Sequence, residues 1–216
     1  MIKFEDVTCK FVSGSGIEEA SFEVGPGEFV CIIGPTGAGK TTLLRLIYMD
    51  IFPEKGKVKV AEFSSVKIKR RRIPYLRRKV GMVFQEFELL EDRSVYENVA
   101  IPLHVIGLNI KEIRPRVTNV LEELGISDKS HHLPSELSGG EQQIVSLARA
   151  IVKEPIVVLA DEPTGNLDPA ASLKIIKLLE QINSDGTAVL MATHNYSFVK
   201  DRGHRFIEIV EGRVTA

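Results

Sequence analysis

The sequence predicts an α/β fold built on a mostly parallel β-sheet, and three observations support this prediction. The short apolar run 29–33 is followed by a glycine-rich segment and a helical pattern at 43–48, which is a strand–loop–helix order. The continuous apolar runs 156–160 and 187–192 are typical of central parallel strands, which are buried on both faces. No strand pattern occurs between about 86 and 153, so we expect a helical subdomain inserted in the α/β domain.

The domain organisation expected from these patterns is one domain over residues 1–216. Its core comprises 1–85 and 154–216, and the helical subdomain comprises about 86–153. The remaining elements are expected as strands at 2–11, 20–24, 57–61, 80–84 and 205–210, a loop at 13–16, and helices at 94–107, 113–124, 138–151 and 169–182. Pro102 is expected to kink or break its helix.

Composition excludes several functional classes. The chain has 216 residues, 44% of them hydrophobic, which allows one sizeable core. Its formal net charge of -1 gives no global attraction to nucleic acid or acidic lipid. Cys9 and Cys31 fall in predicted strands, and we interpret both as core residues in a reducing compartment. The N-terminus does not resemble a signal peptide and no apolar run is long enough to span a membrane, so a membrane role would require a partner.

A basic run interrupts this balanced charge between Lys67 and Lys79. One interpretation is a solvated face, or a helix whose long side chains extend over the sheet. The alternative is contact with lipid headgroups or with an acidic partner. A nucleic-acid contact is a further, weaker alternative.

The glycine-rich segment fits the phosphate-binding pattern G-x-x-x-x-G-K-[ST] with Gly34, Pro35, Thr36, Gly37, Ala38, Gly39, Lys40, Thr41 and Thr42. Its glycines let the backbone curl so that N–H groups point at an anion, and the helix that follows adds its positive end. In this pattern Lys40 reaches the β- and γ-phosphates and the Thr41 hydroxyl holds Mg²⁺. The strand and helix flanks are those that the motif requires.

Polar side chains at the ends of predicted strands are the candidates for the chemistry. Asp161 and Glu162 follow the buried run 156–160, where carboxylates are costly unless a cation or a proton accompanies them. We expect Asp161 to bind Mg²⁺ and Glu162 to act as a base towards water. Gln85 and His194 also end strands, and therefore face the same ligand crevice.

A second helix start suited to phosphate begins at Ser138. Ser138 is a good N-cap, and Glu141 three residues later completes a capping box. Gly139 and Gly140 between them leave N–H groups free at the positive end of the helix. Phe11 is either a half-buried strand aromatic or a face on which a purine stacks.

These motifs, in this order, resemble those of ATP-binding-cassette (ABC) ATPases. The resemblance covers essentially the whole chain and rests on GPTGAGKTT at Gly34, Gln85, LSGGEQQ at Leu137, VVLADEP at Val157, NLD at Asn166, and His194. It implies a phosphate-loop ABC-ATPase fold with an N-terminal antiparallel β-subdomain. It also implies hydrolysis of ATP with Mg²⁺, in two sites between two cassettes arranged head to tail.

The resemblance further implies roles for individual residues. The phosphate loop of one chain would face Ser138, Gly139, Gly140 and Glu141 of the other. Gln85 would touch Mg²⁺ and the attacking water, Glu162 would polarise that water, and His194 would hold the γ-phosphate. Asp168 would link the two sites, and Phe11 would stack on adenine. Phe11 stands where tyrosine is more usual, Ile144 where arginine is usual, and Asn195 where aspartate is usual.

Within this family, four strings resemble the FtsE group of cell-division ATPases: IPYLRRKVGMVFQ at Ile73, LLEDRSVYENVAIPL at Leu89, ADEPTGNLD at Ala160 and VLMATH at Val189. That resemblance implies an ATP-bound homodimer on the cytoplasmic face of the membrane. Its integral membrane partner, FtsX-like, would pass on a signal that controls cell-wall hydrolysis. ATPases of lipoprotein-release and macrolide-export systems share several of these strings and are the alternative; a DNA-associated ATPase is a remote one.

The resemblance also implies a groove after Gln85 that receives a short helix from the membrane subunit. It would include Phe87, Leu89, Leu90 and Tyr96, apolar residues in an otherwise acidic segment. The alternative is that all four belong to the core of the helical subdomain.

Overall fold

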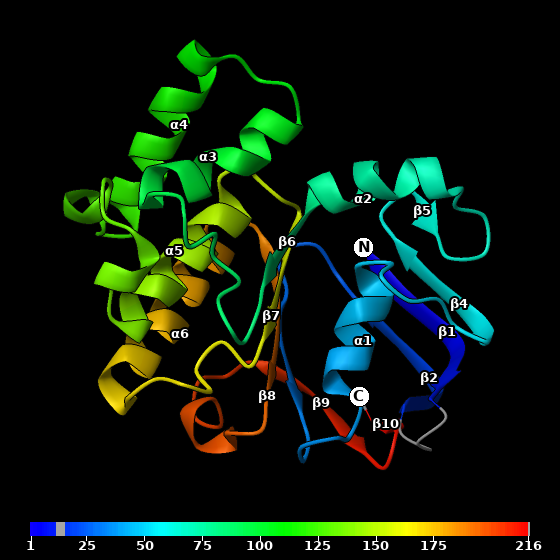
Figure 1. Cartoon of the computed structure of the whole chain (residues 1–216). Helices are drawn as coiled ribbons and strands as arrows, with labels where there is room; N and C mark the ends of the chain where they lie inside the picture. Colours follow the sequence, from blue (N-terminus) through cyan, green and yellow to red (C-terminus); the bar gives the residue numbers. More distant parts are fainter. Residues whose placement is uncertain (12–15, 216) are drawn as a thin grey trace.

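A computed structural model describes residues 1–11 and 16–215, so residues 13–15 of the expected loop lie outside the described residues. The described strands form one sheet in the order β5-β4-β1-β2-β10-β9-β3-β8-β7-β6 (Figure 1). They are β1 (Ile2–Lys10), β2 (Gly16–Val24), β3 (Phe29–Ile33), β4 (Lys55–Val60), β5 (Phe63–Ser64), β6 (Val80–Val83), β7 (Val157–Asp161), β8 (Ala188–Thr193), β9 (Arg205–Val210) and β10 (Arg213–Thr215).

The described α-helices are α1 (Lys40–Ile47), α2 (Ile73–Lys79), α3 (Val95–Val105), α4 (Ile110–Glu123), α5 (Gly139–Ile151) and α6 (Pro169–Ser184). Short 3-10 turns are η1 (Arg70–Arg72), η2 (Ser127–Lys129), η3 (Pro134–Glu136) and η4 (Tyr196–Phe198). No described helix combines the length and the apolar character needed to cross a bilayer.

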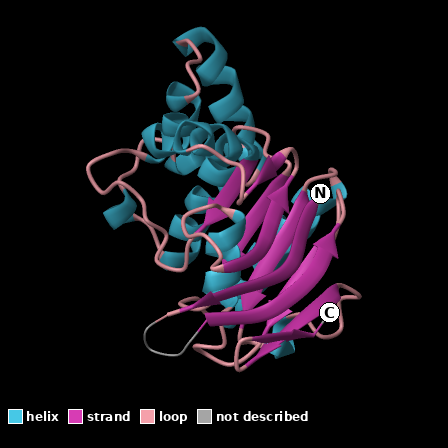
Figure 2. Cartoon of the chain, turned by 90° about the vertical axis from the view of Figure 1, so that its right-hand side faces the viewer, coloured by secondary structure: helices cyan, strands magenta, loops and turns pink. Residues whose placement is uncertain are grey.

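The sheet has a parallel part and an antiparallel part, as the sequence predicts. β9, β3, β8, β7 and β6 pair in parallel, neighbour to neighbour. β1 pairs antiparallel with β2 and β4, and β4 pairs antiparallel with β5. The strands lie side by side in one twisted sheet (Figure 2). The carboxyl ends of β3, β6, β7 and β8 therefore lie along one edge, where ligands bind in open α/β sheets.

Two hydrophobic cores lie on opposite faces of the parallel sheet. Along β3, Phe29 and Cys31 pack into one core and Val30 and Ile32 into the other, since successive side chains of a strand point to opposite faces. Helices α3 to α6 cover the first face, and α1, α2 and the antiparallel strands cover the second (Figure 1). Cys9 and Cys31 are both buried free thiols.

Residues 84–156, between β6 and β7, contain helices and no strand. α3 runs through Pro102 to Val105, so of the two expected outcomes the break at Pro102 is wrong, whereas the kink stays a prediction. The flanking Val99 and Leu103 are fully buried, and this packing holds the helix together despite the missing N–H group. α1 begins at Lys40 rather than at Leu43, because the glycine loop leads directly into it.

Candidate nucleotide-binding and catalytic site

The phosphate loop connects β3 to α1, and glycine is required at its bends. Gly37 and Gly39 have φ of 80° and 113°, in the region that side chains disfavour. A Cβ atom on Gly39 would lie 2.7 Å from the carbonyl oxygen of Gly16. Gly39 is the N-cap of α1, so the first amides of that helix open towards the loop.

Lys40 is the cation of this loop and is only 6% exposed. Its Nζ donates hydrogen bonds to the carbonyl oxygens of Gly34 (2.8 Å) and Pro35 (3.1 Å). The same Nζ lies 3.2 Å from Oε1 of Glu162, from the end of β7. A charge this deeply buried needs a partner, and in this structure the partner is the carboxylate expected to be the base.

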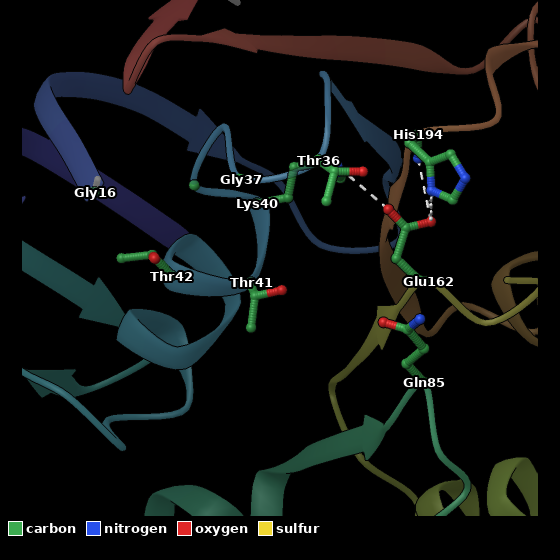
Figure 3. A pocket seen from close by; sticks show the side chains of 10 residues that line it. Gly16, Thr36, Gly37, Lys40, Thr41, Thr42, Gln85, Glu162 and His194 are labelled. Atoms are coloured by element: carbon green, nitrogen blue, oxygen red, sulfur yellow. Dashed lines mark hydrogen bonds and ion pairs between the residues drawn. The ribbon is translucent and has the colours of Figure 1, made fainter. Parts of the chain in front are cut away.

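Glu162 sits at the centre of the site in a strained backbone conformation, with φ of 44°. Its Oε2 accepts a hydrogen bond from the backbone N–H of His194 (3.1 Å) and lies 3.0 Å from the Nδ1 atom of the same residue. Lys40, Glu162 and His194 therefore form one chain of contacts, with Gln85 beside it (Figure 3). Three elements that are far apart in sequence are joined through this one carboxylate.

Lys40, Glu162 and His194 line a cavity of about 280 Å³. Its lining includes Gly16, Thr36, Gly37, Gly39, Lys40, Thr41, Thr42, Gln85, Glu162 and His194. The phosphate loop and all three expected catalytic side chains thus converge on one cavity. The arrangement can hold an anion against a buried cation and aligned amides, next to a carboxylate able to accept a proton.

The surroundings of Asp161 show whether this site is suited to a magnesium ion. Burial raises the pKa of its carboxyl group, and the nearby Thr41 hydroxyl offsets this only in part. Its Oδ1 atom is buried and has no hydrogen-bond partner among the described residues. The described residues contain no cluster of three or more His, Cys, Asp or Glu side chains suited to a metal. Mg²⁺ at phosphate sites uses one or two protein oxygens together with water and phosphate oxygens, so Asp161 and Thr41 fit it.

The helix start at Ser138 is built as the sequence predicts but lies apart from the cavity. Ser138 Oγ accepts from the N–H of Glu141 (3.3 Å), and Ser138 N–H donates to Glu141 Oε2 (2.8 Å). This confirms the capping box, which holds the pKa of Glu141 below its usual value. None of Ser138, Gly139, Gly140 and Glu141 lines the phosphate-loop cavity.

Two other predicted nucleotide contacts are also outside the cavity. Asp168 is the N-cap of α6, where Oδ1 accepts from the N–H groups of Ala170 (2.8 Å) and Ala171 (3.0 Å). Phe11 is 39% exposed at the end of β1. One chain thus gathers the phosphate loop, Asp161, Glu162, Gln85 and His194, whereas none of the other predicted contacts lines this cavity.

The four residues expected in the partner groove have different environments. Leu89 is buried in the core of the helical segment, whereas Leu90 is exposed. Phe87 and Tyr96 are half-buried and pack against that core. The structure therefore places Leu89 with the core, and only Leu90 is freely accessible.

Three residues that the sequence reasoning missed support the site. Gly16 lines the cavity and lies close to Gly39, but in the sequence it is one of several serines and glycines in a row and no motif distinguishes it. The buried Gln143 on α5 donates to the carbonyl oxygen of Pro163 (2.8 Å), next to Glu162. Arg149 donates to the carbonyl oxygens of Phe87 (2.8 Å) and Glu88 (2.6 Å), and so fixes the turn after Gln85. The contacts of Gln143 and Arg149 join residues that are far apart in the sequence, so no local pattern predicts them.

Comparisons with known proteins agree with this geometry. A model of the ABC transporter family matches residues 17–165. Cell division ATP-binding protein FtsE of Streptococcus pneumoniae is 49% identical over 99% of this chain and 94% of that protein. FtsE of Escherichia coli is 44% identical over 99% of this chain and 97% of that protein.

Solved structures show the same fold. A dimeric ATP-binding cassette, MJ0796, bound to ADP and Pi, matches with a TM-score of 0.89 and 32% identity, over 100% of this chain and 97% of that one. CbiO1 of Clostridium perfringens, part of the ABC transporter complex cbiONQ, matches with a TM-score of 0.90 and 30% identity, over 100% and 86%.

The fold and the site define an ATPase cassette of the ABC type. The chain belongs to the ABC transporter family of ATP-binding proteins and, within it, to the FtsE group. It is accordingly an FtsE-type ATPase subunit that binds and hydrolyses ATP.

Proposed function

We propose that ATP is hydrolysed between two copies of this chain, each of which supplies half of the site. The observation that carries the proposal is the separation of the two phosphate-suited helix starts. The start of α1 lines the cavity, whereas the start of α5, in the helical subdomain of about 86–153, does not. A head-to-tail dimer brings Ser138, Gly139, Gly140 and Glu141 of the second copy onto the phosphates, and the MJ0796 cassette is itself dimeric with ADP and Pi.

The reaction is an in-line attack of water on the γ-phosphate. Lys40 and the loop amides stabilise the charge that spreads over the phosphoryl oxygens. Gln85 and His194 position the water and the γ-phosphate, and Glu162 accepts the proton of the water. Asp161 and Thr41 hold Mg²⁺, which supplies further neutralisation of phosphate charge when it is bound.

The ion pair between Lys40 and Glu162 gives this mechanism an order of events. A triphosphate in the loop competes for Lys40 Nζ, which lies 3.2 Å from Glu162 Oε1. Once Lys40 turns to the phosphates, the Glu162 carboxylate is released from the ion pair and is free to contact the attacking water. Nucleotide binding therefore prepares the base.

The work of the cycle is delivered to an integral membrane partner of the FtsX kind, on the cytoplasmic face of the membrane. The relatives at 49% and 44% identity are named as cell division proteins, which supports a role in division, and the signal that we propose is one that controls cell-wall hydrolysis. Closing and opening of the dimer provides the movement, because closure is coupled to ATP and opening to its hydrolysis. Phe11 stacks on adenine, and Asp168 links the two composite sites.

Sedimentation velocity tests the composite site. Glu162→Gln keeps the loop and Lys40 but removes the base, so it should accumulate as a dimer in Mg-ATP and remain monomeric in Mg-ADP. The matched control, Lys40→Ala combined with Glu162→Gln, should remain monomeric in both. A Glu162→Gln chain that stays monomeric in Mg-ATP, even with the membrane subunit present, would contradict the proposal.

A further inference from the structure

The basic run of the sequence forms a surface that the ATPase does not use. We define the basic surface as Lys67, Lys69, Arg70, Arg71 and Arg72, on and before η1, with Tyr75 on α2. Residues 67–79 hold eight Lys and Arg and no Asp or Glu, so the rest of the chain carries a formal charge of -9. The near-zero net charge of the chain therefore conceals a strongly positive region.

The cations of the basic surface are directed to solvent. Lys67, Lys69, Arg70 and Arg71 are exposed, and none of them forms an ion pair with a described carboxylate. Farther along α2 the cations are engaged: Arg77 pairs with Asp50 (3.5 Å) and Lys79 pairs with Glu62 (2.9 Å). The structure thus separates basic residues that serve the fold from a group that has no partner within the described chain.

A groove of about 380 Å³ lies among these free cations. Its lining includes Lys67, Lys69, Arg71 and Arg72, and its only acid, Glu62, is neutralised by Lys79. A phosphate group in this groove meets several cations and no free carboxylate. Anionic phosphate chemistry is therefore what the groove is suited to bind.

This surface is not part of the ATP site. Arg77 of α2 donates to the carbonyl oxygens of Tyr48 and Met49 (both 3.3 Å), which follow the C-terminal end of α1. The phosphate loop precedes the opposite end of α1, whose eight residues span about 12 Å. Figure 1 shows α2 and β5 at the far end of α1 from the loop that follows β3.

Exposed apolar side chains beside the groove indicate which kind of phosphate-bearing partner the basic surface is suited to. Tyr75 is 49% exposed, and the guanidinium groups of Arg72 and Arg78 lie 5.1 Å and 4.9 Å from its ring centre. Val66, next to the first cation of the surface, is 67% exposed. Aromatic and aliphatic side chains among lysines and arginines suit the boundary between headgroups and acyl chains. Nucleic acid backbones offer no such boundary to Val66.

We propose that the basic surface binds anionic phospholipid headgroups, with phosphates in the groove and Tyr75 and Val66 at the edge of the acyl region. The inference rests on the proposed function only in placing the chain beside a membrane. Clusters of four to eight Lys or Arg give a reversible, salt-sensitive attachment. Such an attachment orients the cassette on the membrane without a transmembrane segment.

Vesicle flotation tests the charge part of the proposal. The full chain should float with vesicles that contain phosphatidylglycerol and not with pure phosphatidylcholine vesicles at about 0.1 M salt, where charges act over roughly 10 Å. The triple variant Lys69→Gln, Arg70→Gln, Arg71→Gln should bind at least about tenfold more weakly. The matched control removes three exposed cations elsewhere, by Lys111→Gln, Arg114→Gln and Lys177→Gln, and should bind within about twofold of the parent chain.

A tryptophan reporter tests the apolar part. The chain contains no tryptophan, so Tyr75→Trp introduces a single one at the basic surface. Its emission should shift to shorter wavelength with phosphatidylglycerol vesicles. Tyr196→Trp, at a tyrosine that is 48% exposed and lies outside the basic surface, should not shift.

Three results would overturn the proposal. One is equal binding by the triple variant and its control, and another is no shift for Tyr75→Trp. The third is tighter binding to duplex DNA than to anionic vesicles at the same salt, since this would assign the surface to nucleic acid. ATP turnover should be unchanged in every one of these variants, so failure of the lipid proposal and failure of the ATPase proposal are distinguishable.

Discussion

Two helix starts in this chain are suited to phosphate, and they differ in what surrounds them. The start of α1 has a buried cation, Lys40, and the carboxylates Asp161 and Glu162 beside it. The start of α5 has a complete capping box followed by two glycines, and none of its residues lines the phosphate-loop cavity. The groups around the α1 start can bind a phosphate and take part in its hydrolysis, whereas those at the α5 start can only bind a phosphate.

In the proposed mechanism, the chemistry therefore belongs to the α1 start, and the α5 start controls it. The α5 start offers the partial positive charge of a helix end, and its carboxylate, Glu141, is engaged by Ser138 in the capping box. In the proposed mechanism, it contributes to hydrolysis when a second chain presents it. The start of α3 is a natural comparison for the start of α5. It has an equivalent capping box, made by Ser94 and Glu97, but the residue after the capping serine is Val95 rather than a glycine.

The largest expected effect is on turnover at the α1 start. Glu162→Gln should lower the ATP hydrolysis rate by about 100-fold, as expected for loss of a positioned base, while ATP affinity is kept. Phosphate release at saturating ATP measures the rate. Glu123→Gln, an exposed glutamate on α4, is the control and should retain the parent rate. Turnover by Glu162→Gln near that of the control would remove Glu162 from the role of base.

The next effect is on nucleotide affinity at the same start. Lys40→Ala removes the cation that meets the phosphates, a loss of about 1.5 to 3 kcal/mol, or roughly 10- to 100-fold in dissociation constant. Calorimetric titration with ATP measures it. Lys153→Ala is the matched control, because Lys153 is a half-buried lysine outside the cavity; burial lowers its pKa to about 8. Equal ATP affinity for both variants would contradict the assignment of the loop.

A matched pair of serine variants separates capping from catalysis. Ser138→Ala and Ser94→Ala should each lower the free energy of unfolding by about 1 kcal/mol, because each removes one N-cap. Denaturant titration measures this shared loss. Only Ser138→Ala should also weaken dimerisation in Mg-ATP. If both variants dimerise equally well, the α5 start has no part in the composite site.

The smallest effect is on the stability of the nucleotide-free chain. Asp161→Asn removes a buried charge whose Oδ1 has no partner, so the free energy of unfolding at pH 7 should rise by about 1 kcal/mol. The pKa of Asp161 is raised on folding, so its charge opposes folding at neutral pH and this opposition fades as pH falls. The gain should therefore shrink in acid. A loss of stability at pH 7 would show that the charge is well paired.

Much of the local structure was predictable because its causes are local. The glycine loop, the continuous apolar runs of β7 and β8 and the capping box of Ser138 and Glu141 each depend on residues a few positions apart. The break expected at Pro102 failed for the opposite reason. The packing of α3 against distant residues outweighs the local cost of the proline.

Local sequence patterns are enough to predict a phosphate loop, a carboxylate pair at the end of a buried strand and a serine-capped helix start with two glycines. The contacts that join Lys40, Glu162 and His194 depend instead on how distant strands are arranged in the sheet. The tertiary structure also left the α5 start outside the cavity and placed the basic surface at the far end of α1. Hydrogen-bonding patterns reach a few residues along the chain, whereas these placements depend on sheet order and packing across about 150 residues.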